Sequence, residues 1–163
     1  MLSLGIDPGT ATVGFGLVRE LSDSSLEAVH YGVITTPPGI PMHERLKQIY
    51  DELTQLIETY QPDHAGVEEL FFARNVTTAI TVAQGRGVIL LALTNADLPI
   101  AEYKPNMIKQ SISGYGGADK RQMQEMVRML LGLEEMPKPD DAADALAVAI
   151  TDIHSSRYTG LMG

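Results

Sequence analysis

Hydrophobic residues at the start of the chain recur at every second position. Apolar residues alternate with small or polar ones in three segments, and short polar links separate these segments. The segments span residues 2–7, 13–19 and 27–35. This period is typical of β-strands, and short links join antiparallel neighbours. The pattern therefore predicts an antiparallel β-meander, in which Gly14 and Gly16 allow another part of the protein to approach closely.

The hydrophobic period becomes helical after Pro37-Pro38-Gly39 interrupts the pattern. We predict helices over residues 43–60, 75–96, 105–112, 120–131 and 139–154, and strands over 65–70 and 98–103. A meander followed by alternating helices and strands is typical of an α/β fold with a mixed sheet flanked by helices, here of five strands. With no internal repeat, residues 1–163 are expected to form a single domain, with a short flexible tail after about residue 155.

Composition limits the chemistry that is open to the chain. There is no cysteine among the 163 residues, which excludes disulfides, a thiol nucleophile and cysteine-based zinc sites. No segment approaches the roughly 18–20 apolar residues that a membrane span needs, and no signal peptide is visible, so we expect a cytoplasmic protein. The net charge of −9 argues against a nucleic-acid partner, although bound cations would offset part of it.

Acidic residues stand where two of the predicted strands end. Asp7 closes the first strand before a Pro-Gly turn, a position where a simple turn aspartate is also common. Glu68 and Glu69 close the short apolar run that begins at Ala65. Because neighbouring strand residues point to opposite faces, at most one of these two glutamates is expected to be a ligand. The periodicity does not distinguish between them.

A second acidic group opens the last predicted helix. Asp141 and Asp144 are three residues apart, so they share one face of the first turn, and small alanines surround them. The helix dipole alone favours acidic residues at this end and is sufficient for Asp140. It does not explain carboxylates on the packed, alanine-lined face of an otherwise apolar helix.

Asp7, one of the two glutamates, Asp141 and Asp144 together form a plausible metal site. Hard oxygen ligands suit Mg²⁺ or Mn²⁺. Two such cations, roughly 3.5–4 Å apart, can promote the attack of water on a phosphodiester. The sequence therefore predicts a metal-dependent phosphodiester hydrolase, and its four histidines, which lack ligand spacing, are given no role.

Four motifs, in order along the chain, resemble those of the RuvC-type Holliday junction resolvases. The motifs are Ile6-Asp7-Pro8-Gly9 with Val13-Gly14-Phe15-Gly16; Val67-Glu68-Glu69-Leu70-Phe71 with Ala73-Arg74-Asn75; Lys109-Gln110 with Gly114-Tyr115-Gly116 and Ala118-Asp119-Lys120; and Asp141-Ala142-Ala143-Asp144-Ala145-Leu146-Ala147. Each motif alone is weak evidence for the family, whereas four motifs in the same order over nearly the whole chain are specific evidence for it. The resemblance implies an RNase H-like fold.

The resemblance also implies roles for individual residues. The four metal ligands, for two Mg²⁺ or Mn²⁺ ions per site, are Asp7, Glu68, Asp141 and Asp144. Lys109 and Lys120 complete the catalytic set beside the scissile phosphate, where a lysine can bind phosphate as a point charge. The resemblance implies that both lysines also contact DNA.

Further DNA contacts follow the second motif and the start of the predicted helix over 120–131. Phe71 is expected to contact bases at the centre of the junction, although a phenylalanine here could also be a core residue. Arg74, Asn75 and Arg121 are expected to be additional contacts. Six basic residues fall in the half of the chain around the site and predict a basic groove on an acidic body. They are Arg74, Arg86, Lys104, Lys109, Lys120 and Arg121.

The family resemblance implies an endodeoxyribonuclease of DNA recombination and repair. It would cut four-way DNA junctions by paired symmetric nicks, leave 5′-phosphates, act as a homodimer and work with a branch-migration motor. The apolar helix over 75–96 resembles the family's dimer helix, but it is equally compatible with a central core helix. Two alternatives are an RNase H-like paralogue acting on other nucleic acids and an actin-like nucleotide-binding module, whose opening strand, aspartate and turn are similar to residues 5–10.

Overall fold

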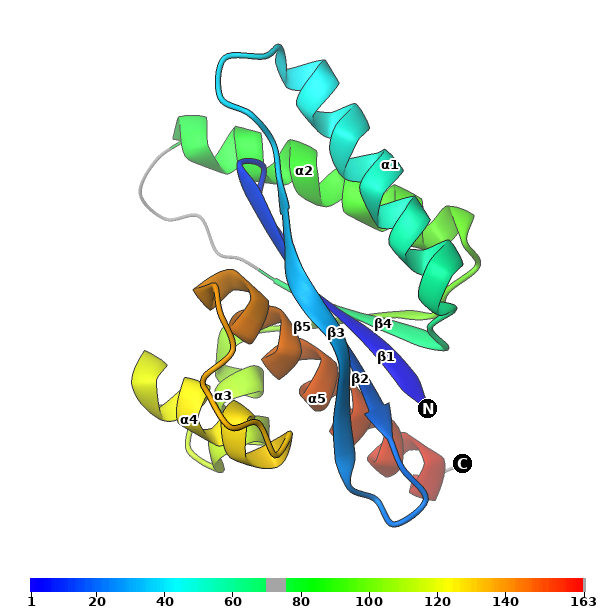
Figure 1. The fold of residues 1–163 in the computed structure, drawn as a ribbon, viewed down its shortest axis with the longest axis vertical. Helices are drawn as coiled ribbons and strands as arrows, with labels where there is room; N and C mark the ends of the chain where they lie inside the picture. The colour runs from blue at the N-terminus through cyan, green and yellow to red at the C-terminus, as the bar shows by residue number, and fades with distance from the viewer. Residues whose placement is uncertain (70–75, 163) are drawn as a thin grey trace.

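The strands of the computed structural model, which describes residues 1–69 and 76–162, form one mixed sheet (Figure 1). They are β1 (Leu2–Asp7), β2 (Thr12–Glu20), β3 (Leu26–Thr35), β4 (His64–Glu68) and β5 (Ile100–Tyr103). Their order across the sheet is β3-β2-β1-β4-β5. The first three strands are antiparallel neighbours, whereas β4 runs parallel to both β1 and β5. The predicted five-stranded mixed sheet with a β-meander is confirmed.

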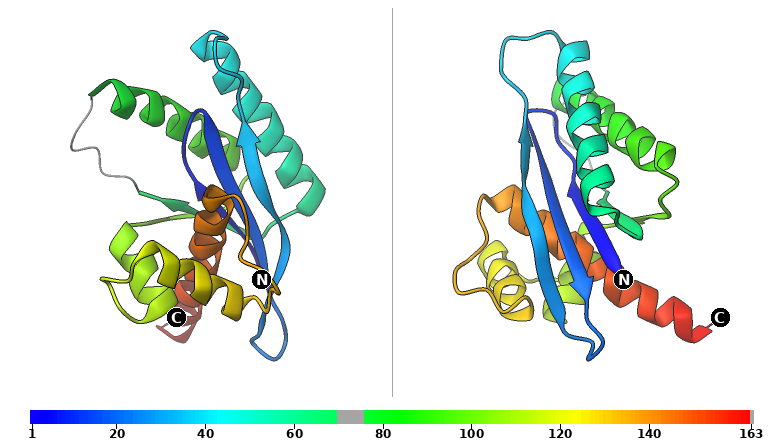
Figure 2. Two further views of the ribbon diagram at one scale, coloured as in Figure 1. Left: turned by 60° about the vertical axis from the view of Figure 1, so that its left-hand side comes forward. Right: turned by 45° about the vertical axis from the view of Figure 1, so that its right-hand side comes forward.

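Helices cover both faces of this sheet (Figure 2). They are α1 (Met42–Tyr60), α2 (Val76–Asn95), α3 (Pro105–Ser113), α4 (Lys120–Leu130) and α5 (Asp140–Met162). α1 and α2 pack on one face, and α5 packs on the other together with α3 and α4. Among the helices of the described residues, none is long and apolar enough to cross a membrane.

One helix end was predicted wrongly, because α5 does not stop at His154 but continues to Met162. The apolar pattern ends near His154, and polar contacts hold the next turn instead. Arg157 donates hydrogen bonds to the Glu20 carboxylate at 2.7 Å and to the backbone oxygen of Ser24 at 3.0 Å. The flexible tail expected after about residue 155 is therefore helical as far as Met162.

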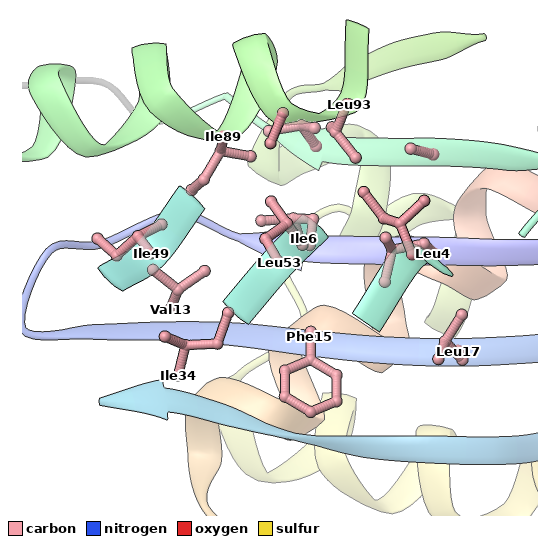
Figure 3. Close-up of a cluster of buried hydrophobic side chains, with 14 of the residues drawn as sticks. Leu4, Ile6, Val13, Phe15, Leu17, Ile34, Ile49, Leu53, Ile89 and Leu93 are labelled. Carbon is pink, nitrogen blue, oxygen red and sulfur yellow. The ribbon is translucent and has the colours of Figure 1, made fainter. Parts of the chain in front are cut away.

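The period of two in β1 and β2 places large apolar side chains on the α1/α2 face. Leu4 and Ile6 are fully buried there, in contact with a layer that α1 and α2 supply through Leu53, Ile89 and other residues (Figure 3). Full burial of each such side chain stabilises the fold by roughly 1.5–3 kcal/mol. This face is a conventional hydrophobic core and holds the strands in register.

The opposite face of the same strands carries glycines, and α5 lies directly on them. A Cβ atom at Gly5 would lie 2.1 Å from the backbone oxygen of Ala145, and one at Gly14 would lie 2.0 Å from that of Asp141. Gly16 is similarly close to the backbone of Leu146. The predicted close approach at Gly14 and Gly16 is confirmed, and the element that approaches is α5.

A buried carboxylate fixes α5 at the far end of this face. Asp152 is 1% exposed and accepts hydrogen bonds from the hydroxyls of Ser3, at 2.6 Å, and Tyr103, at 2.7 Å. Its Oδ2 atom also lies 2.7 Å from Nδ1 of His64. These partners come from β1, β5 and β4, so Asp152 joins α5 to three strands. His64, which was given no role from the sequence, is a structural partner.

The packing of α5 on glycine predicts a large effect of a single methyl group. We expect Gly5→Ala to lower the free energy of unfolding by about 3 kcal/mol or more, because the new Cβ overlaps backbone atoms that cannot rotate away. Thermal and denaturant unfolding of the metal-free protein measure the change. The matched control is Gly160→Ala in α5, where no atom of the described residues outside its chain neighbours lies within 4 Å of the Cβ position, and which should raise stability by roughly 0.5–1 kcal/mol. Unchanged stability of Gly5→Ala would contradict this account of the packing.

Candidate metal centre

Asp7 and Glu68 lie side by side at the ends of two neighbouring parallel strands. β1 and β4 pair in a register that aligns Ile6 with Val67, so the next residue on each strand is an acid. Val67 belongs to the core on the α1/α2 face, which leaves Glu68 on the α5 face together with Asp7. The sheet therefore brings Glu68, and not Glu69, beside Asp7.

The N-terminal turn of α5 adds two more carboxylates to these strand ends. Asp7 pairs across the sheet with Gly14, and the absent side chain of Gly14 leaves room for the backbone of Asp141. As a result, carboxylate oxygens of Asp7, Asp141 and Asp144 all lie within 4.8 Å of one another. Glu68 is outside this group of three but hydrogen-bonds Asp7. The structure thus brings together the four acids that the sequence predicted.

The carboxylates repel one another strongly in this half-buried setting. Burial, followed by the charges of Glu68, Asp144 and Asp141, raises the pKa of Asp7 to about 8. Burial and the charge of Asp144 raise the pKa of Glu68 to about 7, against the opposing effects of Asp7 and Lys109. The pKa of Asp144 is also raised, chiefly by burial. Each of these acids is held in surroundings that penalise its ionised form.

A divalent cation fits this donor set. Three carboxylates with oxygens in such close reach, and a fourth attached to them, offer only hard oxygen ligands of the kind that Mg²⁺ and Mn²⁺ prefer. A bound cation would reverse the repulsion that raises the pKa values, because the dominant local charge becomes positive. The acidic cluster is therefore suited to a divalent metal ion.

A pocket of about 250 Å³ opens beside the carboxylates, and both predicted lysines line it. Glu68 and Asp144 form part of its wall, together with Lys109 of α3 and Lys120 of α4. Much of the rest is apolar and comes from α3, α4 and α5. Lys109 and Lys120 therefore lie where an anion bound at the acidic cluster would meet positive charge.

Asp140 was assigned only to the helix dipole, but it also has a specific partner. Its Oδ2 atom lies 3.0 Å from Nζ of Lys120, and its Oδ1 atom accepts a 3.0 Å hydrogen bond from Gln124. Both partners are on α4, so Asp140 joins the first turns of α4 and α5. Sequence reasoning missed this contact because nothing in the pattern indicates that α4 packs there.

The other predicted DNA contacts are less well defined by the structure. Phe71, Arg74 and Asn75 lie outside the described residues. Arg121 is exposed on α4 and lines a different pocket next to Tyr115, not the pocket beside the carboxylates. Its role in binding DNA stays a prediction.

Arg86, one of the six basic residues expected around the site, lies beside it but has partners within the fold. Its side chain is 18% exposed and forms an ion pair with Glu102 of β5. It also donates a hydrogen bond to the backbone oxygen of Glu68. Arg86 is close to the acidic cluster but is occupied within the fold.

The raised pKa values predict how stability depends on pH in the metal-free protein. The pKa of Asp7 in the folded state, about 8, exceeds its ordinary value of 3.8. The folded protein therefore binds a proton that the unfolded chain releases, and stability is lost as pH rises between these values. In EDTA at pH 9, we expect Asp7→Asn to be more stable than the wild type by about 2 kcal/mol.

At pH 5 most of this gain should disappear, because Asp7 of the wild type is then protonated. Denaturant unfolding at the two pH values measures the difference. Adding Mg²⁺ at pH 9 should stabilise the wild type more than the variant. A variant that is less stable than the wild type at both pH values in EDTA would contradict the repulsion described for the site.

Comparison with known proteins identifies the family. The model of the family described as "Crossover junction endodeoxyribonuclease RuvC" matches residues 3–152. A protein of that name from Chloroflexus aggregans is 59% identical over 156 residues, which cover 96% of this chain and 94% of the relative.

The structure of Thermus thermophilus RuvC is similar, with a TM-score of 0.90, 35% sequence identity and coverage of 98% and 97% of the two chains. T. thermophilus RuvC in complex with a Holliday junction substrate gives a TM-score of 0.89 at 33% identity, over 97% of this chain and 96% of the other. The RNase H-like fold expected from the motifs is thereby confirmed. The chain belongs to the RuvC family of crossover junction endodeoxyribonucleases.

Proposed function

We propose that this protein resolves four-way DNA junctions by paired symmetric nicks, through two-metal-ion hydrolysis of phosphodiesters in recombination and repair. The observation that carries the proposal is the close group of Asp7, Asp141 and Asp144, with Glu68 attached, beside a pocket lined by two lysines. A similar protein of this family has been solved with a Holliday junction substrate. Family membership leaves no place for the actin-like module considered from the sequence.

Asp7, Glu68, Asp141 and Asp144 would hold two Mg²⁺ or Mn²⁺ ions per site. When bound, such cations lower the pKa of an attacking water and stabilise the leaving oxygen. The four carboxylates come from two strand ends and one helix, so the sheet and α5 fix their mutual positions. Small movements of any one of these elements would change the site.

Two lysines would bind the phosphate next to the acids. Lys109 and Lys120 enter the pocket from α3 and α4, on the side of Glu68 and Asp144. Asp140 holds Lys120 at the first turn of α4, which limits the positions its ammonium group adopts. A lysine so placed stabilises the negative charge that develops on the phosphate oxygens. Water is the nucleophile in this scheme, leaving a 5′-phosphate and a 3′-hydroxyl, with no covalent intermediate.

Contacts with the junction would extend beyond the scissile phosphate. Phe71 would contact bases at the junction centre, and Arg74, Asn75 and Arg121 would contact the backbone nearby. The net charge of −9 opposes binding over most of the surface. We therefore expect junction affinity to depend on the few cations around the site, with a salt dependence set by their number.

A homodimer would supply the two active sites that paired nicks require. α2 supports this proposal, because its outer face carries an exposed stripe of apolar and small residues at helical spacing. The stripe consists of Val76, Ile80, Ala83, Gly87 and Leu91. Two copies of such a stripe can pack on each other about a two-fold axis. We further propose that the dimer acts in the cytoplasm together with a branch-migration motor.

The direct test of the proposed function is cleavage of a labelled synthetic four-way junction. A linear duplex and an RNA–DNA hybrid of the same sequence serve as comparison substrates, and each substrate is assayed with Mg²⁺, with Mn²⁺ and with EDTA. We expect symmetric nicks on the junction alone, absent in EDTA. Asp144→Asn should reduce the rate by roughly 100-fold or more, because the cation loses a ligand.

The matched control is Asp51→Asn, which removes an exposed carboxylate on α1 that pairs with Lys47, and which should cleave like the wild type. Equal cleavage of the duplex or the hybrid would refute junction selectivity and favour a paralogue acting on other nucleic acids. Binding without cleavage under either metal would refute the catalytic proposal.

The dimer proposal is tested by a charge placed in the α2 stripe. Leu91 is 53% exposed, and Leu91→Glu should weaken self-association by at least roughly tenfold, because a carboxylate would be buried in an apolar interface. Sedimentation equilibrium measures the dissociation constant. Leu21→Glu, in the β2–β3 turn at 41% exposure, is the control and should associate like the wild type. A wild-type protein that stays monomeric at tens of micromolar, or a Leu91→Glu variant that dimerises normally, would overturn the proposal.

A further inference from the structure

Arg86 connects α2 to the backbone of a proposed metal ligand. Its Nη1 atom donates a 2.5 Å hydrogen bond to the backbone oxygen of Glu68, the last residue of β4. Its Nη2 atom pairs with the carboxylate of Glu102 on β5. With 18% of its side chain exposed, the guanidinium is largely removed from water. One planar group therefore links α2, the end of β4 and β5.

The same part of α2 also holds the chain next to Asp7. A Cβ atom at Gly85 would lie 2.6 Å from the backbone oxygen of Gly9, so α2 rests directly on the β1–β2 turn. The hydroxyl of Thr10 donates a 2.7 Å hydrogen bond to the backbone oxygen of Thr81. α2 thus contacts the backbone beside both strand-end acids, although it contributes no side chain to the acidic cluster.

The chemistry of arginine suits this position better than that of any other residue. The planar fork of a guanidinium donates to two acceptors in fixed directions, whereas the lysine ammonium is a point charge on a flexible stem. The charge of Arg86 is balanced by Glu102. The partial burial of Arg86 beside the acidic cluster therefore does not carry the free-energy cost of an unpaired charge. Removing the fork would leave the Glu68 carbonyl and the Glu102 carboxylate without this shared donor.

Glu68 is the acid for which such support matters most. The three aspartates form the close group, and Glu68 lies outside it, next to Asp7 and close enough to Asp144 to feel its charge. The direction of its side chain depends on where the final residue of β4 is held. On the β5 side, the backbone N–H of Glu69 donates a 2.8 Å hydrogen bond to the backbone oxygen of Tyr103. On the α2 side, Arg86 donates to the backbone oxygen of Glu68.

We propose that Arg86 is a positioning residue for Glu68 in the metal centre. It acts by donating a hydrogen bond to the backbone carbonyl of Glu68 while it forms an ion pair with Glu102. This inference rests on the proposed function. It assigns to α2 a role in the active site in addition to its exposed stripe, since the flank of the helix next to that stripe holds a proposed ligand.

The test compares Arg86→Lys, Arg86→Gln and Glu102→Gln with the wild type. Calorimetric titration with Mn²⁺ gives metal affinity, single-turnover cleavage of the junction gives the rate, and binding in EDTA gives junction affinity. We expect both arginine variants to lose roughly 10–100-fold in metal affinity and in rate, with junction affinity within about twofold of the wild type. Lysine should not rescue, and Glu102→Gln should show a smaller loss, because it retains an acceptor.

A double variant separates positioning from a general structural effect. If Arg86 acts through Glu68, Arg86→Lys should change Mn²⁺ affinity much less in a Glu68→Gln background than in the wild type. An equal loss in both backgrounds, or full rescue by lysine, would overturn the proposal. So would weaker junction binding with an unchanged rate, which would identify Arg86 as a DNA contact.

The matched control is Arg19→Lys, in an exposed ion pair with Glu27 on β2 and β3, which should behave as the wild type in all three assays. The metal titration keeps this test apart from the proposed function. If the wild type binds Mn²⁺ but cleaves no junction, the proposed function fails, and the Mn²⁺ affinities still decide the role of Arg86.

Discussion

The close packing of α5 against the glycines of the sheet is the constraint on which the rest of the structure depends. At Gly5 and Gly14 the backbone of α5 occupies the space that a Cβ atom would need. This contact brings the first turn of α5 down onto the end of β1, so that two helical carboxylates meet Asp7. The alanines of α5 serve the same purpose from the other side, because larger side chains would hold the helix away. At the far end, Asp152 fixes the position of α5 along the sheet through hydrogen bonds to three strands. A conventional core on the α1/α2 face stabilises the fold, while the glycine face determines where α5 places its carboxylates relative to Asp7.

The geometry works against the stability of the metal-free protein. Burial and mutual repulsion raise the pKa of Asp7 to about 8 and that of Glu68 to about 7, so the folded state resists full ionisation of its own site. The same repulsion is what makes the site attractive to divalent cations. The basic side chains around the site have different partners. Lys120 is paired with Asp140 at the rim, and the half-buried Arg86 hydrogen-bonds the backbone of Glu68. One positive charge near the site, that of Lys120, therefore lines the pocket, while another, that of Arg86, holds the backbone of Glu68.

Much of the fold and of the acidic cluster could be predicted from the sequence, because both depend on local patterns. The period of two defined β1 to β3, and the change of period defined most helices. Position at strand ends and in a helical first turn identified the four acids, with the family motifs selecting Glu68 over Glu69. What could not be predicted depends on contacts between distant segments. The pairing of Arg86 with Glu102, that of Lys120 with Asp140, and the role of His64 all require knowing which elements meet. The end of α5 was also missed, because Arg157 and Glu20 hold the last turns without any apolar pattern.

The measurement that tests the central claim most directly is anomalous diffraction from crystals grown with Mn²⁺. The account predicts manganese peaks between the carboxylates of Asp7, Glu68, Asp141 and Asp144, with Mn–O distances near 2.2 Å, about the length expected for carboxylate oxygens on a first-row divalent ion. It also predicts that the peaks weaken in crystals of Asp7→Asn grown under the same conditions. Manganese bound elsewhere on the protein, with no peak among these four side chains at saturating concentration, would contradict the claim that the packing of α5 on the sheet builds a metal centre.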